Sequence, residues 1–140
     1  MLDARYVAGL FDGEGSLGLY RHHRGRFTLR TQLVQNIYPA SKLLFDELIA
    51  KFGGNASPQR SLSGKRKFNW QLHAHKAAAF LRWIYPYLRF KREEAMIALD
   101  WQMIKPEPTR DKHTGWFKPY PASAEDKRAA AQLKRLKRKR

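Results

Sequence analysis

The sequence predicts an α+β protein in which helices and β-hairpins alternate along the chain. Segments whose apolar residues recur every three to four positions, as in amphipathic helices, are separated by segments in which apolar and polar residues alternate, as in half-buried strands. Turn residues divide each alternating segment into two strands. We therefore expect the order αββαββα, with a four-stranded antiparallel sheet and a helical extension at the C-terminus.

The first helix and the first hairpin lie within the N-terminal 35 residues. Asp3 is a suitable N-cap, and Gly13 and Gly15 are expected to end the helix. Polarity alternates from Ser16 onward and is interrupted by a turn at residues 22–25. This pattern predicts two antiparallel strands directly after a helix of about three turns.

The second helix and the second hairpin repeat this arrangement. Pro39 suits the first position of a helix predicted over Ala40 to Lys51, which the pair of glycines after Phe52 ends. Alternation returns from residue 55 to residue 74, with a turn at residues 63–65. A second β-hairpin is therefore expected.

Two more helical segments are predicted at 75–88 and 90–104, separated near Pro86, with Ala95, Met96, Leu99 and Met103 on the apolar stripe of the latter. Residues 105–122 contain four prolines and no clear period, which indicates a linker. Ser123 to Asp126 resembles a capping box at the start of a basic helix. We therefore divide the chain into a core (1–104), a proline-rich linker (105–122) and a basic C-terminal helix or tail (123–140).

Composition limits the classes of protein to consider. The chain has 140 residues, of which 43% are apolar, and its 8 Phe, 6 Tyr and 4 Trp provide a core for one domain. It has no cysteine, so disulfides and thiolate chemistry are excluded. No apolar run approaches the roughly 20 residues of a membrane span, and Asp3 is atypical of a secretory leader. We expect an intracellular protein that is neither secreted nor membrane-bound, in a bacterial or phage cytoplasm or in an organelle.

The net charge of +16 predicts a polyanionic partner. Lys127 to Arg140 carries eight basic and no acidic residues, and most of the remaining excess lies around the two hairpins. Basic residues that neutralise phosphates release condensed counterions, which favours nucleic acid. An anionic membrane would require a basic amphipathic helix, which only the tail offers. A non-specific ribosomal or nucleoid protein remains a second interpretation.

The segment Val7 to Gly15 has unusual features for a helix terminus. Gly9 and Gly13 share one helical face, with Ala8 and Asp12 adjacent, so a partner helix could approach closely there. Glu14 is unfavourable near the negative end of a helix dipole unless a positive group compensates. A divalent cation such as Mg²⁺ would fit, since it prefers oxygen ligands and accepts phosphate oxygens. An ordinary helix C-terminus is the competing interpretation of the same residues.

This stretch resembles the LAGLIDADG motif of homing endonucleases, and the predicted αββαββα order over residues 3–104 resembles the core of that family. Val replaces Leu, Phe replaces Ile, Gly replaces Ala and Glu replaces the final Asp of the motif. One motif copy implies a homodimer that pairs two motif helices through Ala8, Gly9, Asp12 and Gly13. The implied activity is hydrolysis of both strands of double-stranded DNA, with no small-molecule substrate.

The resemblance also implies roles for individual residues. Glu14, with the carbonyl of Gly15, would bind Mg²⁺ or another divalent cation such as Mn²⁺. Lys91 and Gln35 would act near the attacking water, and Gln32 is a rival of Gln35 for the same role. A non-catalytic maturase or transcription factor that uses the same fold is the alternative to a nuclease.

A twisted antiparallel sheet can enter the major groove as a saddle and present alternate side chains to base edges. The basic and amide residues of the two hairpins and of the tail are therefore the candidate DNA contacts. They are Arg21, Arg24, Arg26, Arg30, Gln32, Gln59, Arg60, Lys65, Lys67, Asn69, Gln71, Lys134 and Arg135. The tryptophans at positions 70, 83 and 101 are expected in the core, and the histidine pairs at 22–23 and 73/75 are not expected to bind zinc.

Overall fold

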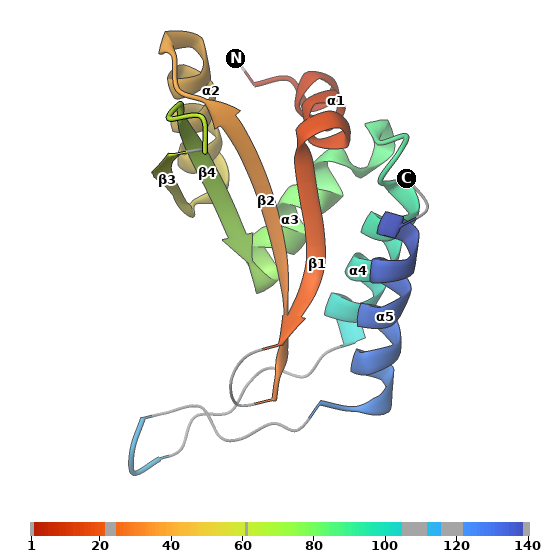
Figure 1. Cartoon of the computed structure of the whole chain (residues 1–140). Coiled ribbons are helices and arrows are strands. Elements are labelled where there is room, and N and C mark those ends of the chain that lie inside the picture. The colour runs from red at the N-terminus through yellow and green to blue at the C-terminus, as the bar shows by residue number, and fades with distance from the viewer. Residues whose placement is uncertain (1, 22–24, 61, 105–111, 116–121, 139–140) are drawn as a thin grey trace.

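A computed structural model describes residues 2–21, 25–60, 62–104, 112–115 and 122–138. Helices and strands alternate as the sequence predicts, and Figure 1 labels them. In chain order they are α1 (Ala4–Glu14), β1 (Gly15–Arg21), β2 (Phe27–Asn36), α2 (Pro39–Phe52), β3 (Asn55–Arg60), β4 (Arg66–His73), α3 (Ala74–Ile84), the 3-10 turn η1 (Tyr85–Tyr87), α4 (Arg92–Ile104) and α5 (Ala124–Arg138). The predicted αββαββα order is confirmed for the core.

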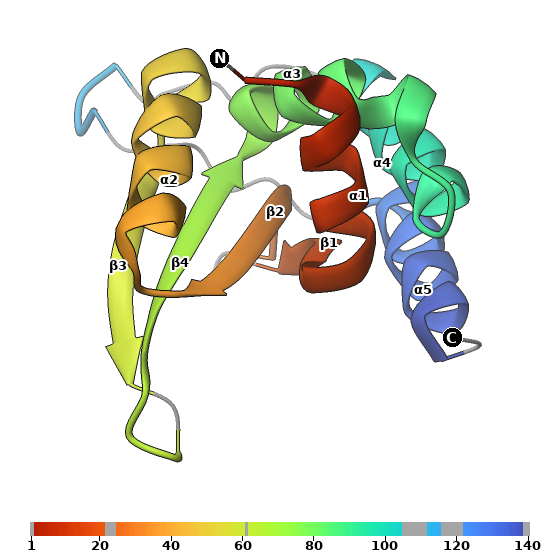
Figure 2. The same cartoon turned by 90° about the horizontal axis from the view of Figure 1, so that it is seen from above.

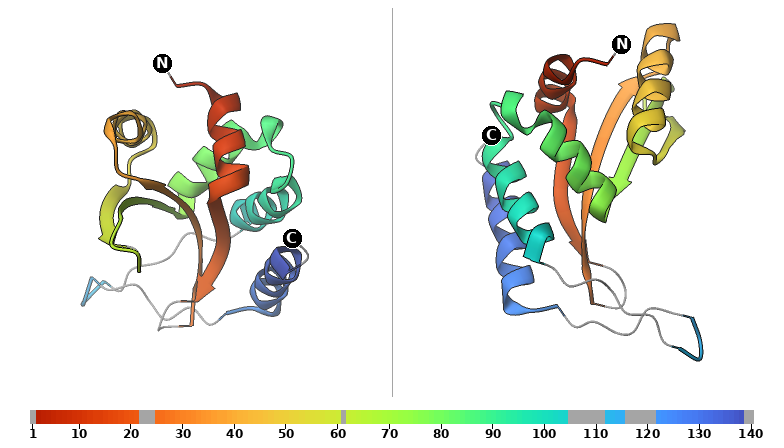
Figure 3. Two further views of the ribbon diagram at one scale, coloured as in Figure 1. Left: turned by 45° about the horizontal axis from the view of Figure 1, so that its top comes forward. Right: turned by 180° about the vertical axis from the view of Figure 1, so that it is seen from behind.

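The four strands form one antiparallel sheet in the order β1-β2-β4-β3. The register pairs Leu17 of β1 with Thr31 of β2, and Thr31 with Leu72 of β4. Helix α3 covers one face of this sheet, as the view from behind in Figure 3 shows, while Figure 1 looks on to the other face. The sheet therefore has one covered face and one open face.

Side chains alternate between the two faces along each strand, so apolar residues lie on one face and polar residues on the other. The covered face carries the buried leucines of β1 and β2, together with Trp70 and Leu72 of β4. The open face carries the residues in the opposite phase, nearly all of which can form hydrogen bonds. They are Ser16, Tyr20, Thr28, Arg30, Gln32, Val34, Asn36, Asn55, Ser57, Gln59, Lys67, Asn69, Gln71 and His73.

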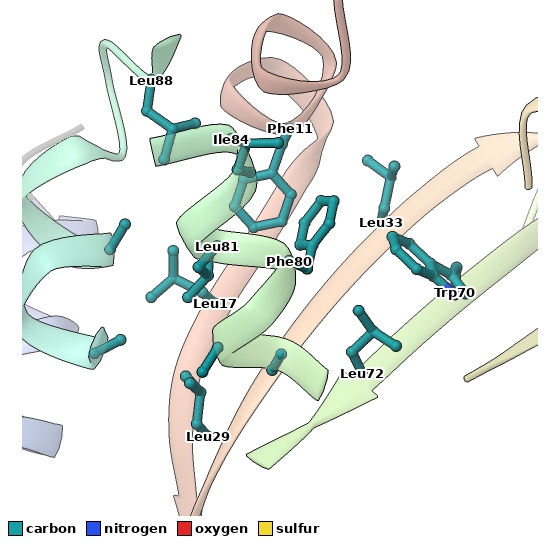
Figure 4. Close-up of a cluster of buried hydrophobic side chains, with 14 of the residues drawn as sticks. Phe11, Leu17, Leu29, Leu33, Trp70, Leu72, Phe80, Leu81, Ile84 and Leu88 are labelled. Atoms are coloured by element: carbon teal, nitrogen blue, oxygen red, sulfur yellow. The ribbon is translucent and has the colours of Figure 1, made fainter. Parts of the chain in front are cut away.

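Aromatic rings join the sheet to the helices in the core. Phe80 of α3 makes edge-to-face contacts with Phe11 of α1, at 5.5 Å between ring centroids, and with Trp70 of β4, at 5.0 Å. Figure 4 shows these rings between the helix and the strands, with Leu33 and Leu72 beside them. This packing fixes α1 against the sheet, and Trp70 and Trp101 are buried as predicted.

Helix α4 buries a different stripe from the one that the sequence predicts. Ala95, Ala98 and Trp101 face the core, whereas Met96 and Met103 are 45% and 75% exposed. The expectation for the two methionines is therefore wrong. Small and aromatic residues form the buried stripe because α4 lies between α3 and α5.

Helix α5 packs on both β1 and α4. The indole N–H of Trp101 donates to Asp126 at 2.8 Å, and Ser123 and Asp126 exchange the two hydrogen bonds of the predicted capping box. Leu133 is 1% exposed, so α5 contributes to the same core as the first 104 residues. Most of the predicted linker, 105–122, lies outside the described residues. Within the described part of the chain, none of the helices is long and apolar enough to cross a membrane.

Candidate functional site

Helix α1 presents one uncovered stripe. Tyr6 is 64% exposed and Gly9 and Gly13 are exposed, and a Cβ added to either glycine would meet no atom within 4 Å. Figure 2 shows α1 from above. A second helix can approach the α1 backbone along the two glycines, because none of the described side chains occupies that space.

The other two residues predicted to meet a partner helix face inward. Ala8 is completely buried in the core, and Asp12 is 9% exposed. Successive positions on a helix are about 100° apart, so the face of Ala8 and Asp12 is turned away from that of Gly9 and Gly13. The expectation that Ala8 and Asp12 lie at a dimer interface is therefore corrected.

Asp12 ties the end of α1 to the segment before α4. Its carboxylate accepts a hydrogen bond from the backbone N–H of Arg89 at 2.7 Å and another from the backbone N–H of Lys91 at 3.0 Å. Hydrogen bonds to an ionised acceptor are about twice as strong as neutral ones. Asp12 thus fixes the position of Lys91 relative to α1.

Lys91 supplies the positive group that the end of α1 requires. Its Nζ donates to the carbonyl of Asp12 at 2.6 Å, and the residue is only 6% exposed. This carbonyl is one of the last four of the helix, which have no partner within the helix. The ammonium group therefore lies at the negative end of the helix dipole, at the carbonyl of a residue two positions before Glu14.

Glu14 is the last residue of α1 and is exposed. Gly15 follows as the first residue of β1, and a Cβ at this position would overlap the ring of Phe11. Only glycine therefore allows α1 to pass directly into β1 over the buried Phe11 side chain. This junction places Glu14 where the uncovered stripe of α1 meets the start of the sheet.

Of the two glutamines considered for the site, Gln32 lies on the open face and Gln35 does not. Gln32 pairs with Ser16, two residues after Glu14. Gln35 is on the same face of β2 as the buried Leu33, which is the covered face. It lines a groove between α1 and α2 together with Leu10. Of the two candidates, Gln32 is therefore the one on the same face as most of the predicted DNA contacts of the strands, and a role for either glutamine near the attacking water stays a prediction.

The remaining predicted contacts divide into groups. Arg30, Gln32, Gln59, Lys67, Asn69 and Gln71 lie on the open face. Arg21 and Arg60 alternate with the residues of the open face, but both are exposed at strand ends. Arg26 and Lys65 directly precede β2 and β4. Arg24 lies outside the described residues. Lys134 and Arg135 are exposed on α5.

Two residues at the edge of the open face, Tyr20 and Lys137, are not among the contacts predicted from the sequence. Lys137 of α5 has its Nζ 6.0 Å from the ring centroid of Tyr20, and a Cβ at Gly18 would lie 3.3 Å from this Nζ. Helix α5 therefore brings positive charge to the β1 edge of the open face. The alternation of β1 placed Tyr20 on this face, but no local pattern indicates that α5 returns to it.

The tip of α1 carries oxygen donors that suit a hard cation. They are the Glu14 carboxylate and the Gly15 carbonyl, both of the kind that Mg²⁺ prefers. No cluster of three or more His, Cys, Asp or Glu suited to a metal occurs among the described residues. The two oxygen donors of Glu14 and Gly15 alone do not fill the six positions of an octahedral Mg²⁺ ion.

Solved structures with a similar architecture are homing endonucleases. I-CvuI with the I-CreI target and Mg is 14% identical to this chain with a TM-score of 0.60, and the match covers 95% of this chain and 80% of that one. The LAGLIDADG homing endonuclease I-SmaMI bound to cleaved DNA is 19% identical with a TM-score of 0.55, over 74% of this chain and 36% of that one. The chain has the fold of the LAGLIDADG homing endonucleases.

This LAGLIDADG fold places the motif-like stretch in α1 and at the start of β1, as predicted. The LAGLIDADG meganuclease I-AabMI, bound to uncleaved DNA, is 14% identical with a TM-score of 0.54. The match covers 74% of this chain but only 36% of the I-AabMI chain, and 65% of an I-CvuI chain in complex with its own target. No protein-family model matches the sequence, and no curated protein matches it.

Proposed function

We propose that this protein is a site-specific double-strand DNA endonuclease that acts as a homodimer with a divalent cation. The observation that carries the proposal is the exposed Glu14 carboxylate at the tip of α1. It lies at the junction of an uncovered glycine stripe, a polar sheet face and a lysine held by Asp12. Each neighbouring feature has a role in cleavage, whereas charge alone would suffice for non-specific binding.

Dimerisation is supported by the stripe of Tyr6, Gly9 and Gly13. Two copies of α1 that cross at these glycines are related by a twofold axis, and such an interface is self-complementary. A twofold axis that runs roughly along the two helices places their C-terminal tips side by side, which would bring two Glu14 carboxylates together. A symmetric pair of half-sites in the DNA follows from this symmetry.

Glu14 and the Gly15 carbonyl of both chains would hold Mg²⁺ or Mn²⁺. When bound, the cation would polarise the scissile phosphate and lower the pKa of a water ligand. Lys91 is positioned by Asp12 to stabilise negative charge at the same tip, and Gln32 can orient a water by hydrogen bonding from the open face. I-CvuI has been solved with target DNA in the presence of Ca and of Mg, which supports this choice of ions for a chain of the same fold.

DNA binding is supported by the open face and its edges. Amide and hydroxyl side chains occupy the middle of this face, and basic residues occupy the hairpin ends and α5. Amides and arginines pair with base edges, while exposed lysines contact phosphate. The face therefore has the chemistry for a duplex whose sequence is read along the strands.

The test is selection of cleaved sites from a random DNA library in the presence of Mg²⁺, followed by cleavage and binding assays on the selected site. Glu14→Gln should abolish cleavage and leave DNA binding within a few-fold of the unaltered protein, because the fold and the basic surface remain. Glu125→Gln removes an exposed carboxylate from the first turn of α5 and serves as the matched control. Full Mg²⁺-dependent cleavage by Glu14→Gln would refute the proposal.

Binding without any cleavage would favour a maturase or a transcription factor of the same fold. A monomer in sedimentation, without sequence preference, would favour a ribosomal or nucleoid protein.

A further inference from the structure

Two buried side-chain polar atoms in the described part of the chain have no hydrogen-bond partner, and both lie on the open face of the sheet. They are Nε of Arg30 in β2 and Oδ1 of Asn69 in β4. Nearly all buried polar groups in folded proteins have a partner. Their occurrence on the same uncovered face suggests that a ligand with complementary donors and acceptors covers this face.

Asn69 lies in a polar environment that leaves its carbonyl oxygen without a donor. The residue is 4% exposed, and the register places it between Val34 of β2 and Ser57 of β3. It lines a cavity of about 380 Å³ together with the polar side chains of Asn55, Ser57, Gln59 and Gln71. The side chain of Val34 has no polar group, so the neighbour of Asn69 on β2 cannot donate a side-chain hydrogen bond to its amide.

Arg30 is held in a defined plane by an aromatic ring. Its guanidinium carbon lies 3.7 Å from the ring centroid of Tyr20, and Lys137 approaches the same ring from α5 at 6.0 Å. Stacking of this kind orients the planar guanidinium, whose terminal N–H groups can form paired hydrogen bonds. A lysine in the same place would keep the charge but not this geometry.

We propose that Arg30 and Asn69 are specificity-determining residues that read two bases of the DNA target in each half-site. The inference rests on the proposed DNA binding and adds the identity of the bases. Arg30 reads a guanine, because arginine donates two hydrogen bonds to O6 and N7 of guanine. Asn69 reads an adenine, because an asparagine amide accepts from N6 and donates to N7 of adenine.

The register gives the spacing between the two bases. Arg30 is paired with His73, and Asn69 is paired with Val34, so the two rows are four residues apart along β2. At about 3.3 Å per residue this separation is about 13 Å. Since each base pair occupies about 3.4 Å of the helix axis, the guanine and the adenine should lie about four base pairs apart.

The test is selection of bound sites from a randomised duplex library by the full chain, with Ca²⁺ in place of Mg²⁺ to retain uncleaved complexes. The unaltered protein should enrich a guanine and an adenine at this spacing in each half-site. Asn69→Leu should remove the preference for the adenine by about 5- to 150-fold and leave the guanine preference intact. Arg30→Lys should remove the preference for the guanine and leave the adenine preference intact. The slope of log affinity against log salt should stay unchanged, because the charge is conserved.

Thermal unfolding separates a reading role from a structural one. If Oδ1 has no partner in the free protein, Asn69→Leu should unfold at the same temperature as Asn55→Leu or above it, where Asn55 is an exposed asparagine of the neighbouring strand. A melting temperature for Asn69→Leu about 5 °C or more below that of Asn55→Leu would mean that the amide holds the fold together, and would overturn the assignment.

The outcomes also separate this inference from the proposed function. Enrichment of no sequence by the unaltered protein would overturn both. Enrichment of a defined site whose base preferences are the same for the protein and both variants would overturn the role of Arg30 and Asn69 alone.

Discussion

Replacement of Asp12 by alanine should destabilise the protein far more than the loss of an exposed carboxylate would. The change removes the acceptor of two backbone N–H groups, those of Arg89 and Lys91. Each hydrogen bond to a charged group contributes roughly 1.5–3 kcal/mol, and the lower half of the range applies because Arg89 is exposed. We therefore expect a loss of about 3 kcal/mol in the free energy of unfolding.

This loss corresponds to a fall of about 10 °C in Tm, since a chain of 140 residues has an unfolding entropy of about 0.3 kcal/mol/K. Differential scanning calorimetry or urea denaturation measures it. Asp46→Ala is the matched control, because Asp46 pairs with Lys42 at 2.9 Å on the surface and should contribute less than about 1 kcal/mol. Equal stability of the two variants would refute the view that Asp12 anchors Lys91 and the end of α1.

The remaining predictions concern the dimer and the site. Gly9→Leu should leave the stability of the monomer unchanged or slightly higher, because nothing lies within 4 Å of a Cβ at this position and leucine is the better helix former. The same change should convert the proposed dimer to a monomer in sedimentation and abolish cleavage. An intact dimer would contradict the crossing at the glycines. Gln32→Ala should reduce kcat at least tenfold, whereas Gln35→Ala should change kcat less than threefold, because only Gln32 lies on the open face. Single-turnover cleavage measures both effects, and the reverse order would reject the choice of Gln32. Lys134→Gln should weaken binding to all sequences equally and lower the slope of log affinity against log salt by about one, whereas an unchanged slope would remove α5 from the DNA contacts.

The fold was predictable because its periodicities are strong. The glycines around Glu14 and the capping box at Ser123 each have a local physical cause, and the helices that they delimit occur where the sequence predicts them. Met96 and Met103 show the limit of this reasoning. A helix with apolar residues on several sides can bury any of them, and the packing of α3 and α5 selects Ala95, Ala98 and Trp101 instead.

The site was predictable in part, for geometric reasons. Glu14 and Lys91 lie at the same end of α1 only because Asp12 bonds to a segment about 77 residues further along the chain, a contact that no local pattern predicts. Gln32 and Gln35 differ by three residues and therefore lie on opposite faces of a strand, so a shift in the assumed phase exchanges them. Ala8 and Asp12 are next to the glycine stripe in sequence but are turned into the core.

Proximity of the two Glu14 side chains in the assembled protein is the measurement that tests the central claim most directly. The chain has no cysteine, so Glu14→Cys introduces a single reactive thiol at the tip of α1. A short bis-maleimide should convert this variant, bound to its selected DNA site, into a covalent dimer, while Glu125→Cys at the far end of α5 should stay monomeric under denaturing conditions. Efficient linkage at position 125 and none at position 14 would show that the two tips do not meet.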